Sequence, residues 1–154
     1  MTRTNEVPLK LFPPTTHTQS RAVEPVQPGP VNSLITAICM GLIVAFVGTM
    51  YHAWIWYVDK SFFLPWGAML ALALCYLASV WVSLRAGKVW AGSLVGIVAF
   101  LTVALFAFAK PTSILVLVNP EVPVGLAGTV WMLGTLLATI LANVTCNRLT
   151  RRKK

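Results

Sequence analysis

The sequence predicts an all-α integral membrane protein with four transmembrane helices in a compact bundle. Hydrophobic residues make up 57% of its 154 residues and charged residues only 10%, whereas soluble domains average about 45–50% apolar and about 25% charged residues. Four long stretches contain no Asp, Glu, Lys or Arg. Their residues do not alternate between apolar and polar, as the strands of a membrane barrel would. This composition excludes a soluble single domain, a disordered protein and a disulfide scaffold.

The chain begins with a polar, proline-rich segment, residues 1–32, that we expect to be a disordered cytoplasmic tail. Six of the ten prolines lie there, and each proline removes a backbone donor and disfavours helix. The segment also carries too few apolar residues to form a core. An alternative is a docking segment. A cleaved signal peptide is not indicated, because the first apolar run starts too late and is too long.

Four membrane spans follow, and we expect them to be helical because a helix satisfies its own backbone hydrogen bonds within lipid. Each charge-free stretch has the roughly 20 residues that a helix needs to cross a bilayer. The predicted spans cover residues 34–58, 62–84, 89–109 and 124–147, and together they define a transmembrane domain over residues 33–147. A basic tail, residues 148–154, ends the chain.

The connections between the predicted spans differ in length. Asp59–Ser61 and Arg85–Lys88 are tight turns, whereas Lys110–Glu121 is longer and contains prolines. The apolar middle of this third connection, Ile114–Val118, is too short to span a membrane. We therefore expect it to lie in the interface or to pack over the helix ends.

The positions of the basic residues predict the orientation. The N-terminal tail carries three Lys or Arg residues, the Arg85–Lys88 turn two and the C-terminal end five, whereas the opposite side carries only Lys60 and Lys110. By the positive-inside rule, both termini lie in the cytoplasm. Aromatic residues around positions 54–57 form a belt at the outer boundary, which agrees with this orientation.

Small residues recur at three- and four-residue steps along one face of each predicted helix. Helices in lipid associate through close backbone approach and side-chain hydrogen bonds rather than through a hydrophobic drive. These faces therefore predict packing within the chain; homodimerisation is the alternative for the GxxxG of the third helix. The packing residues that we single out are Gly41, Gly48, Gly92, Gly96, Gly128, Thr135 and Thr139.

His52 is the only histidine within a predicted span. We expect a neutral imidazole that hydrogen-bonds to a neighbouring helix; a proton-responsive group and a cofactor ligand are the alternatives. The other histidine, His17, lies in the N-terminal tail, so the chain offers no pair of histidines for a haem. Residues that ligate zinc do not cluster either. We therefore predict no metal and no cofactor.

Asp59 and Glu121 complete a candidate polar cluster with His52 on the outer side. They would form an acid/base pair if the long loop folded over the first turn, although loop carboxylates are more often simply solvated. No predicted span contains an acidic or basic residue, whereas ion-coupled transporters and pumps usually keep such residues on their pathway. We also find no Walker, GxSxG or HExxH motif.

Two further classes of function are disfavoured. The three cysteines, Cys39, Cys75 and Cys146, have no motif spacing that would indicate a redox or metal site. The net charge of +8 arises from residues that mark the ends of apolar segments rather than a basic face. We therefore do not expect nucleic acid as a partner.

Several short motifs form a recognisable pattern along the chain. Phe63–Gly67 leads into an alanine- and leucine-rich helix, and Asn119–Glu121 precedes the glycine-rich segment Gly125–Gly134. Over residues 33–147 this pattern resembles a family of small four-helix actinobacterial membrane proteins of unknown function. The resemblance implies a bacterial plasma membrane protein and assigns a role to no residue.

The sequence favours a non-catalytic function. We expect an accessory or assembly subunit of a larger membrane complex, in contact with the lipid bilayer and with a membrane-protein partner or a second copy. One alternative is a small pore or carrier formed by oligomerisation. Another is an outer-leaflet enzyme that uses His52, Asp59 and Glu121.

Overall fold

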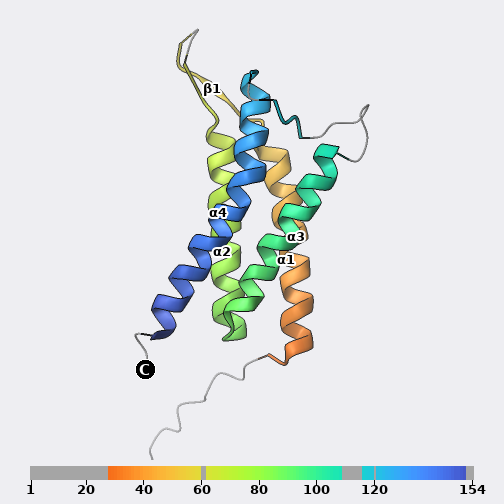
Figure 1. The fold of residues 1–154 in the computed structure, drawn as a ribbon, viewed down its shortest axis with the longest axis vertical. Helices are drawn as coiled ribbons and strands as arrows, with labels where there is room; N and C mark the ends of the chain where they lie inside the picture. The colour runs from red at the N-terminus through yellow and green to blue at the C-terminus, as the bar shows by residue number, and fades with distance from the viewer. Residues whose placement is uncertain (1–27, 60–61, 109–115, 120, 152–154) are drawn as a thin grey trace, which may run out of the picture.

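The computed structural model describes residues 28–59, 62–108, 116–119 and 121–151, and these residues form four packed helices. Each helix is long and apolar enough to cross a membrane, which indicates a multi-pass membrane protein. The helices run alternately up and down, so that α1 begins and α4 ends at the same end of the bundle (Figure 1). Their bounds are α1 (Pro30–Tyr51), α2 (Trp66–Ala86), α3 (Val89–Phe108) and α4 (Pro123–Arg151).

The first two helices are joined by a short β-hairpin that the sequence analysis did not predict. Strand β1 (Trp56–Tyr57) pairs antiparallel with β2 (Phe63–Leu64), and the two rings of Tyr57 and Phe63 lie 6.4 Å apart. The predicted spans 34–58 and 62–84 therefore differ from the helices at this connection: α1 ends at Tyr51, not at residue 58, and α2 begins at Trp66, not at residue 62. Aromatic and β-branched residues favour extended backbone, and Pro65 disfavours helix in the residue before it. At this connection, the two charge-free stretches extend beyond the ends of the helices.

The outer ends of the first and last helices also differ from the predicted bounds. Helix α1 begins at Pro30, inside the predicted tail, because proline fits the first turn of a helix, where its missing amide has no partner to lose. Helix α4 continues past residue 147 to Arg151. Its last turn contains Arg148 and Arg151, because a helix can continue into the charged residues that follow an apolar span. Residues 1–27, for which disorder is predicted, and the final residues 152–154 lie outside the described part of the chain.

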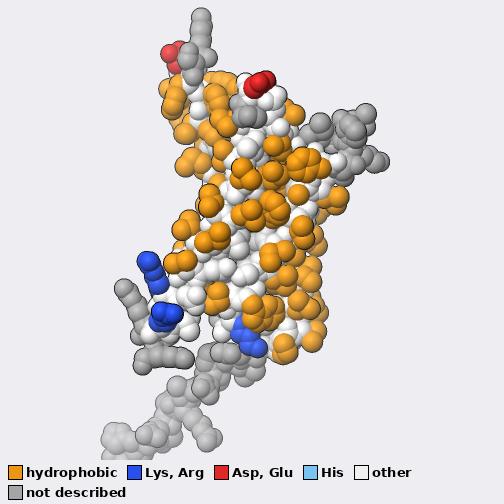
Figure 2. All heavy atoms as spheres, viewed as in Figure 1, with side chains coloured by type: hydrophobic (Ala, Val, Ile, Leu, Met, Phe, Trp, Pro, Cys, Tyr) orange, Lys and Arg blue, Asp and Glu red, His pale blue; other side chains and the backbone are white. Residues whose placement is uncertain are grey.

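The interior of the bundle consists of small residues. Among the described residues, 11 of the 19 buried hydrophobic side chains are alanine, and none is leucine, isoleucine or phenylalanine. Large apolar side chains lie instead on the outer surface of the helices (Figure 2). This is the reverse of a soluble core, where leucine and isoleucine are buried. It is the distribution expected where lipid surrounds the helices and small residues allow close approach.

Four of the five predicted packing glycines lie at close contacts between helices, and the fifth, Gly128, contacts the segment 116–119. Gly41 of α1 faces Val98 of α3, and Gly92 of α3 faces Ser79 of α2. Gly96 of α3 lies directly against the side chain of Thr139 on α4. At each of these positions, an added Cβ would overlap atoms of the neighbouring helix. The absence of a side chain therefore sets the distance between the helices.

The end of the third connection packs against the start of α4. Val116 is fully buried, and the carbonyl of Leu117 contacts Gly128. The carbonyl of Asn119 contacts Gly125 one turn earlier. These two glycines let the segment 116–119 lie directly on the helix backbone. The remainder of the predicted interfacial stretch, residues 114–115, is not described.

Replacement of Gly96 by leucine should weaken the bundle, because the new side chain would enter the space occupied by Thr139. Overpacking of this kind lowers the free energy of unfolding by about 1–3 kcal/mol. The matched control is the neighbouring substitution Ile97→Leu, since Ile97 is 51% exposed on the outer surface. Denaturant unfolding in detergent micelles measures both variants. Equal stabilities for the two would contradict the packing at Gly96.

Candidate functional site

The described charges separate to opposite ends of the bundle. Four basic residues, Arg85, Lys88, Arg148 and Arg151, lie at the α2–α3 turn and in the last turn of α4, which we call the basic end. The described acidic residues, Asp59 and Glu121, lie at the other end, which carries the hairpin and the start of α4 (Figure 2). The remaining two outer charges of the sequence prediction, Lys60 and Lys110, fall outside the described residues.

His52 lies just beyond the last residue of α1 and is only 2% exposed. Its Nδ1 is 2.6 Å from the carbonyl oxygen of Thr49, so Nδ1 carries the proton and donates it. The last carbonyls of a helix have no amide partner within the helix. The carbonyl of Thr49 accepts a hydrogen bond from the imidazole instead. The hydrogen bond therefore runs to its own helix, not to a neighbouring helix as the sequence analysis expected. The buried Nε2 has no hydrogen-bond partner among the described residues.

The three members of the predicted outer cluster occupy different environments. His52 lies inside the bundle, whereas Asp59 and Glu121 are exposed. Asp59 belongs to the tip of the hairpin, and its backbone amide donates to Phe62. The backbone amide of Glu121 donates to the side-chain oxygen of Asn119 at 3.0 Å. An acid/base pair needs its members within reach of one substrate, and the pairing of Asp59 with Glu121 stays a prediction.

Thr49 and Trp131 join His52 in a buried contact that sequence reasoning missed. Trp131 of α4 is fully buried, and its indole packs directly on Gly48 of α1. Its Nε1 donates to the hydroxyl of Thr49 at 3.4 Å. Thr49 thus holds the tryptophan through its side chain and the histidine through its carbonyl. The sequence offered one signal for this contact: Trp131 is the one large residue on a face of α4 that otherwise carries small residues such as glycine and threonine.

Polar side chains also connect the helices toward the basic end. The amide of Asn143 on α4 donates to the hydroxyl of Ser93 on α3 at 2.8 Å, and the hydroxyl of Tyr76 on α2 donates to Thr145 on α4 at 3.0 Å. Buried hydrogen bonds between helices stabilise a bundle in lipid by about 0.6–2 kcal/mol each. The buried hydroxyl oxygen of Ser79 and the side-chain oxygen of Asn143 have no partner among the described residues.

The predicted threonine face of α4 is buried and satisfied within its own helix. Thr135 donates to the carbonyl of Met132, and Thr139 donates to the carbonyl of Thr135, each at 2.7 Å. Both side chains are less than 9% exposed. Both hydroxyls are therefore engaged with backbone, and Thr139 packs against Gly96 of α3. Neither side chain lines an open channel within the single chain.

Two apolar grooves lie on either side of α2. The groove between α1 and α2 has a volume of about 350 Å³, with Gly48 and Ala71 among its lining residues. The groove between α2 and α4 has a volume of about 280 Å³, with Gly134 and Ala138 among its lining residues. Ala73 of α2 lines both. The outer face of α2 is therefore a ridge between two hollows with small residues in their walls. We call this region the α2 face.

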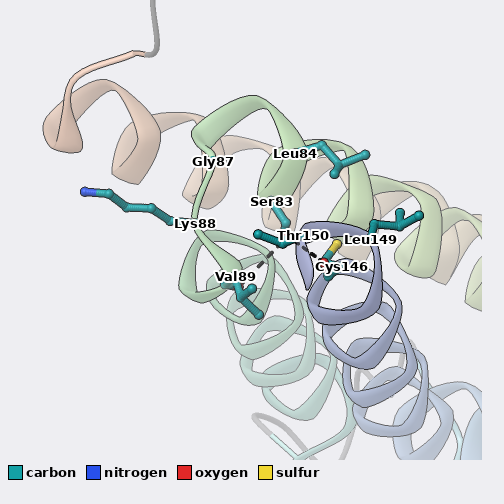
Figure 3. Close-up of a pocket in the computed structure, with 8 residues that line it drawn as sticks. All are labelled: Ser83, Leu84, Gly87, Lys88, Val89, Cys146, Leu149 and Thr150. Atoms are coloured by element: carbon teal, nitrogen blue, oxygen red, sulfur yellow. Dashed lines mark hydrogen bonds between the residues drawn. The ribbon is translucent and has the colours of Figure 1, made fainter. Parts of the chain in front are cut away.

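A third hollow lies at the basic end, where the α2–α3 turn meets the last turns of α4. Its volume is about 400 Å³. Ser83, Lys88 and Thr150 supply its polar groups, and Cys146 adds a buried thiol (Figure 3). This hollow is more polar than the two grooves, because hydroxyls and a lysine replace leucine and alanine in its wall.

The described residues contain no group of three His, Cys, Asp or Glu side chains that could hold a metal ion. Cys75 and Cys146 are buried in the bundle, and Cys39 is exposed on the outer surface of α1. The thiol of Cys146 lies 3.9 Å from the carbonyl oxygen of Val80 on α2. The two buried thiols, Cys75 and Cys146, therefore act as small packing groups.

Comparisons with protein families, with curated proteins and with solved structures find no match to this chain. The resemblance to small actinobacterial membrane proteins therefore stays a prediction. The candidate sites rest on the geometry of the bundle, and the α2 face combines two apolar grooves with the exposed Ala73 between them.

Removal of the Trp131 side chain should destabilise the bundle, because it would leave a cavity against Gly48 and free the hydroxyl of Thr49. Trp131→Ala is expected to lower the free energy of unfolding by about 3–5 kcal/mol. The matched control is Trp81→Ala, since Trp81 is 48% exposed on α2. Thermal unfolding in detergent compares the two. A smaller loss for Trp131→Ala than for Trp81→Ala would contradict this role.

Proposed function

We propose that this protein is a non-catalytic accessory or assembly subunit that binds a larger membrane protein through the α2 face. The single observation that carries the proposal is the pair of apolar grooves beside α2. We further propose a bacterial plasma membrane as its location, with the basic end in the cytoplasm. The ten basic residues on that side of the sequence, against two on the other, support this orientation.

The α2 face has the shape that a partner transmembrane helix requires. Helices in lipid gain stability from close approach over small residues and from packing the ridges of one helix into the grooves of another. Leu70 and Leu77 are 49% and 61% exposed and form the ridge, with Ala73 between them. Side chains of a partner helix would enter the two grooves on either side of this ridge.

The chemistry of the bundle also favours a partner role over an enzyme. The four helices carry basic residues only near their ends and no acidic residue. Half-buried polar groups such as Asn143 and Ser93 bond to each other and thereby hold helices together. A subunit whose task is to bind and position a partner needs such rigid packing and needs no reactive group.

The occupant that we propose for the α2 face is a transmembrane helix of another protein. To test this, a photo-cross-linking phenylalanine analogue replaces Ala73 in the full chain in its native membrane. The control places the same analogue at Cys39, which is exposed on α1 and lies outside both grooves. We expect one defined cross-linked partner from position 73 and none from position 39. No protein cross-link from position 73 would overturn the proposal.

A bulky substitution tests the same surface without a cross-linker. Ala73→Phe would fill the space beside the ridge, and the loss of about 1.4 kcal/mol of binding energy would lower the partner recovered in mild detergent by about tenfold. The control Cys39→Phe should leave recovery unchanged. Equal recovery of the partner with both variants would contradict docking at the α2 face.

A second copy of the chain is the other occupant that the experiment can reveal. A cross-link at position 73 to the same chain, with a homo-oligomer in native mass spectrometry, would replace the accessory proposal with the pore or carrier alternative. Flux through liposomes that contain the purified oligomer would then be the next measurement. A cross-link to lipid alone would remove both interpretations of the α2 face.

A further inference from the structure

We propose that the hollow at the basic end binds the phosphate head group of an anionic phospholipid. This site is separate from the α2 face and holds whether or not the chain has a protein partner. The turn that forms the hollow depends on Gly87, whose φ of 63° lies in the left-handed region that favours glycine. This residue ends α2 and lets α3 begin two residues later, so that Lys88 lies at the mouth of the hollow.

The hollow contains donors that can reach a phosphate oxygen. The hydroxyl of Ser83 donates to the carbonyl of Val89 at 3.5 Å, a long bond whose proton can turn to a better acceptor. Lys88 supplies an ammonium with three donors. In Figure 3 its side chain extends away from Ser83 and Thr150. Capture of a phosphate therefore requires this side chain to rotate, which its four flexible methylenes permit.

The surrounding charges favour an anion. Arg85, Arg148 and Arg151 lie at the same end as Lys88, whereas the described acidic residues lie at the opposite end (Figure 2). A basic residue close to an anionic head group attracts it by about 1 kcal/mol, and this attraction falls off with distance. Lys88 lines the hollow and the three arginines do not, so Lys88 should contribute most. The guanidinium of Arg85 lies 5.4 Å from the ring centre of Trp81, which holds one of these charges at the surface of α2.

The apolar part of the hollow selects a lipid over a free phosphate. Leu84 and Leu149 line the hollow and are 52% and 40% exposed. Figure 3 shows both leucines on the side of the hollow opposite to Lys88. A phospholipid likewise has a charged head group at one end and apolar chains at the other. The head group would therefore lie toward Lys88 and the chains against the two leucines.

The test uses the full chain purified in detergent and native mass spectrometry of its complexes with dioleoyl phosphatidylglycerol or dioleoyl phosphatidylcholine. We expect preferential binding of the anionic lipid, and about fivefold weaker binding after Lys88→Gln. The control is Arg148→Gln, which removes the same charge at the same end. Two residues along a helix turn by about 200°, so Arg148 points away from the side of α4 on which Cys146 and Thr150 line the hollow.

Each outcome bears on the proposal. A site in the hollow would be supported if Arg148→Gln binds the anionic lipid within twofold of the unmodified chain while Lys88→Gln binds it more weakly. Equal losses for both variants would show a diffuse charge effect and would overturn it, as would equal binding of the two lipids. Ser83→Ala removes the second donor and should also weaken binding. Circular dichroism confirms that each variant keeps its helices.

The source of the phosphate is tested with soluble competitors and one apolar variant. Glycerol phosphate and inorganic phosphate lack acyl chains, so neither should displace the lipid at millimolar concentration. Leu149→Gln should weaken lipid binding although it changes no charge. Displacement by either soluble anion, with no effect of Leu149→Gln, would assign the hollow to a free phosphate and would overturn the lipid proposal.

Discussion

The structure depends on the close approach of helix backbones at small residues. In lipid, leucine side chains gain little by turning inward, because the surroundings are as apolar as the core. The bundle therefore keeps alanine and glycine inside and leucine outside. Contacts such as Gly96 with Thr139 and Gly48 with Trp131 follow from this constraint, since each needs a missing side chain on one helix.

The same constraint shapes the surfaces that are available for binding. Small residues that are not covered by another helix leave hollows, and Ala73 marks the ridge between two of them on α2. At the basic end, the left-handed Gly87 leaves a more polar hollow beside Lys88. The side chains of the interior thus pack against one another. The candidate binding sites lie on the outside of the bundle, where a helix or a lipid can reach them.

The sequence predicted the four apolar helices well, because charge-free length is a strong signal. It placed helix ends poorly: the charge-free run through Val58 hides the end of α1 at Tyr51, and aromatic residues continue the run into a hairpin. His52 was predicted to bond across helices, yet it bonds to Thr49 of its own helix. The contact of Trp131 with Gly48 joins residues more than 80 positions apart, and no local pattern encodes such a pairing.

The central proposal is that the four packed helices cross the membrane with the basic end in the cytoplasm. Labelling with a membrane-impermeant thiol reagent tests it most directly, in a chain whose three native cysteines are replaced by alanine. Asp59 lies in the hairpin at one end and Lys88 in the turn at the other, and both are exposed. The account predicts that Asp59→Cys reacts in intact cells and that Lys88→Cys reacts only after permeabilisation. Reaction of both variants in intact cells, or of Lys88→Cys alone, would contradict it.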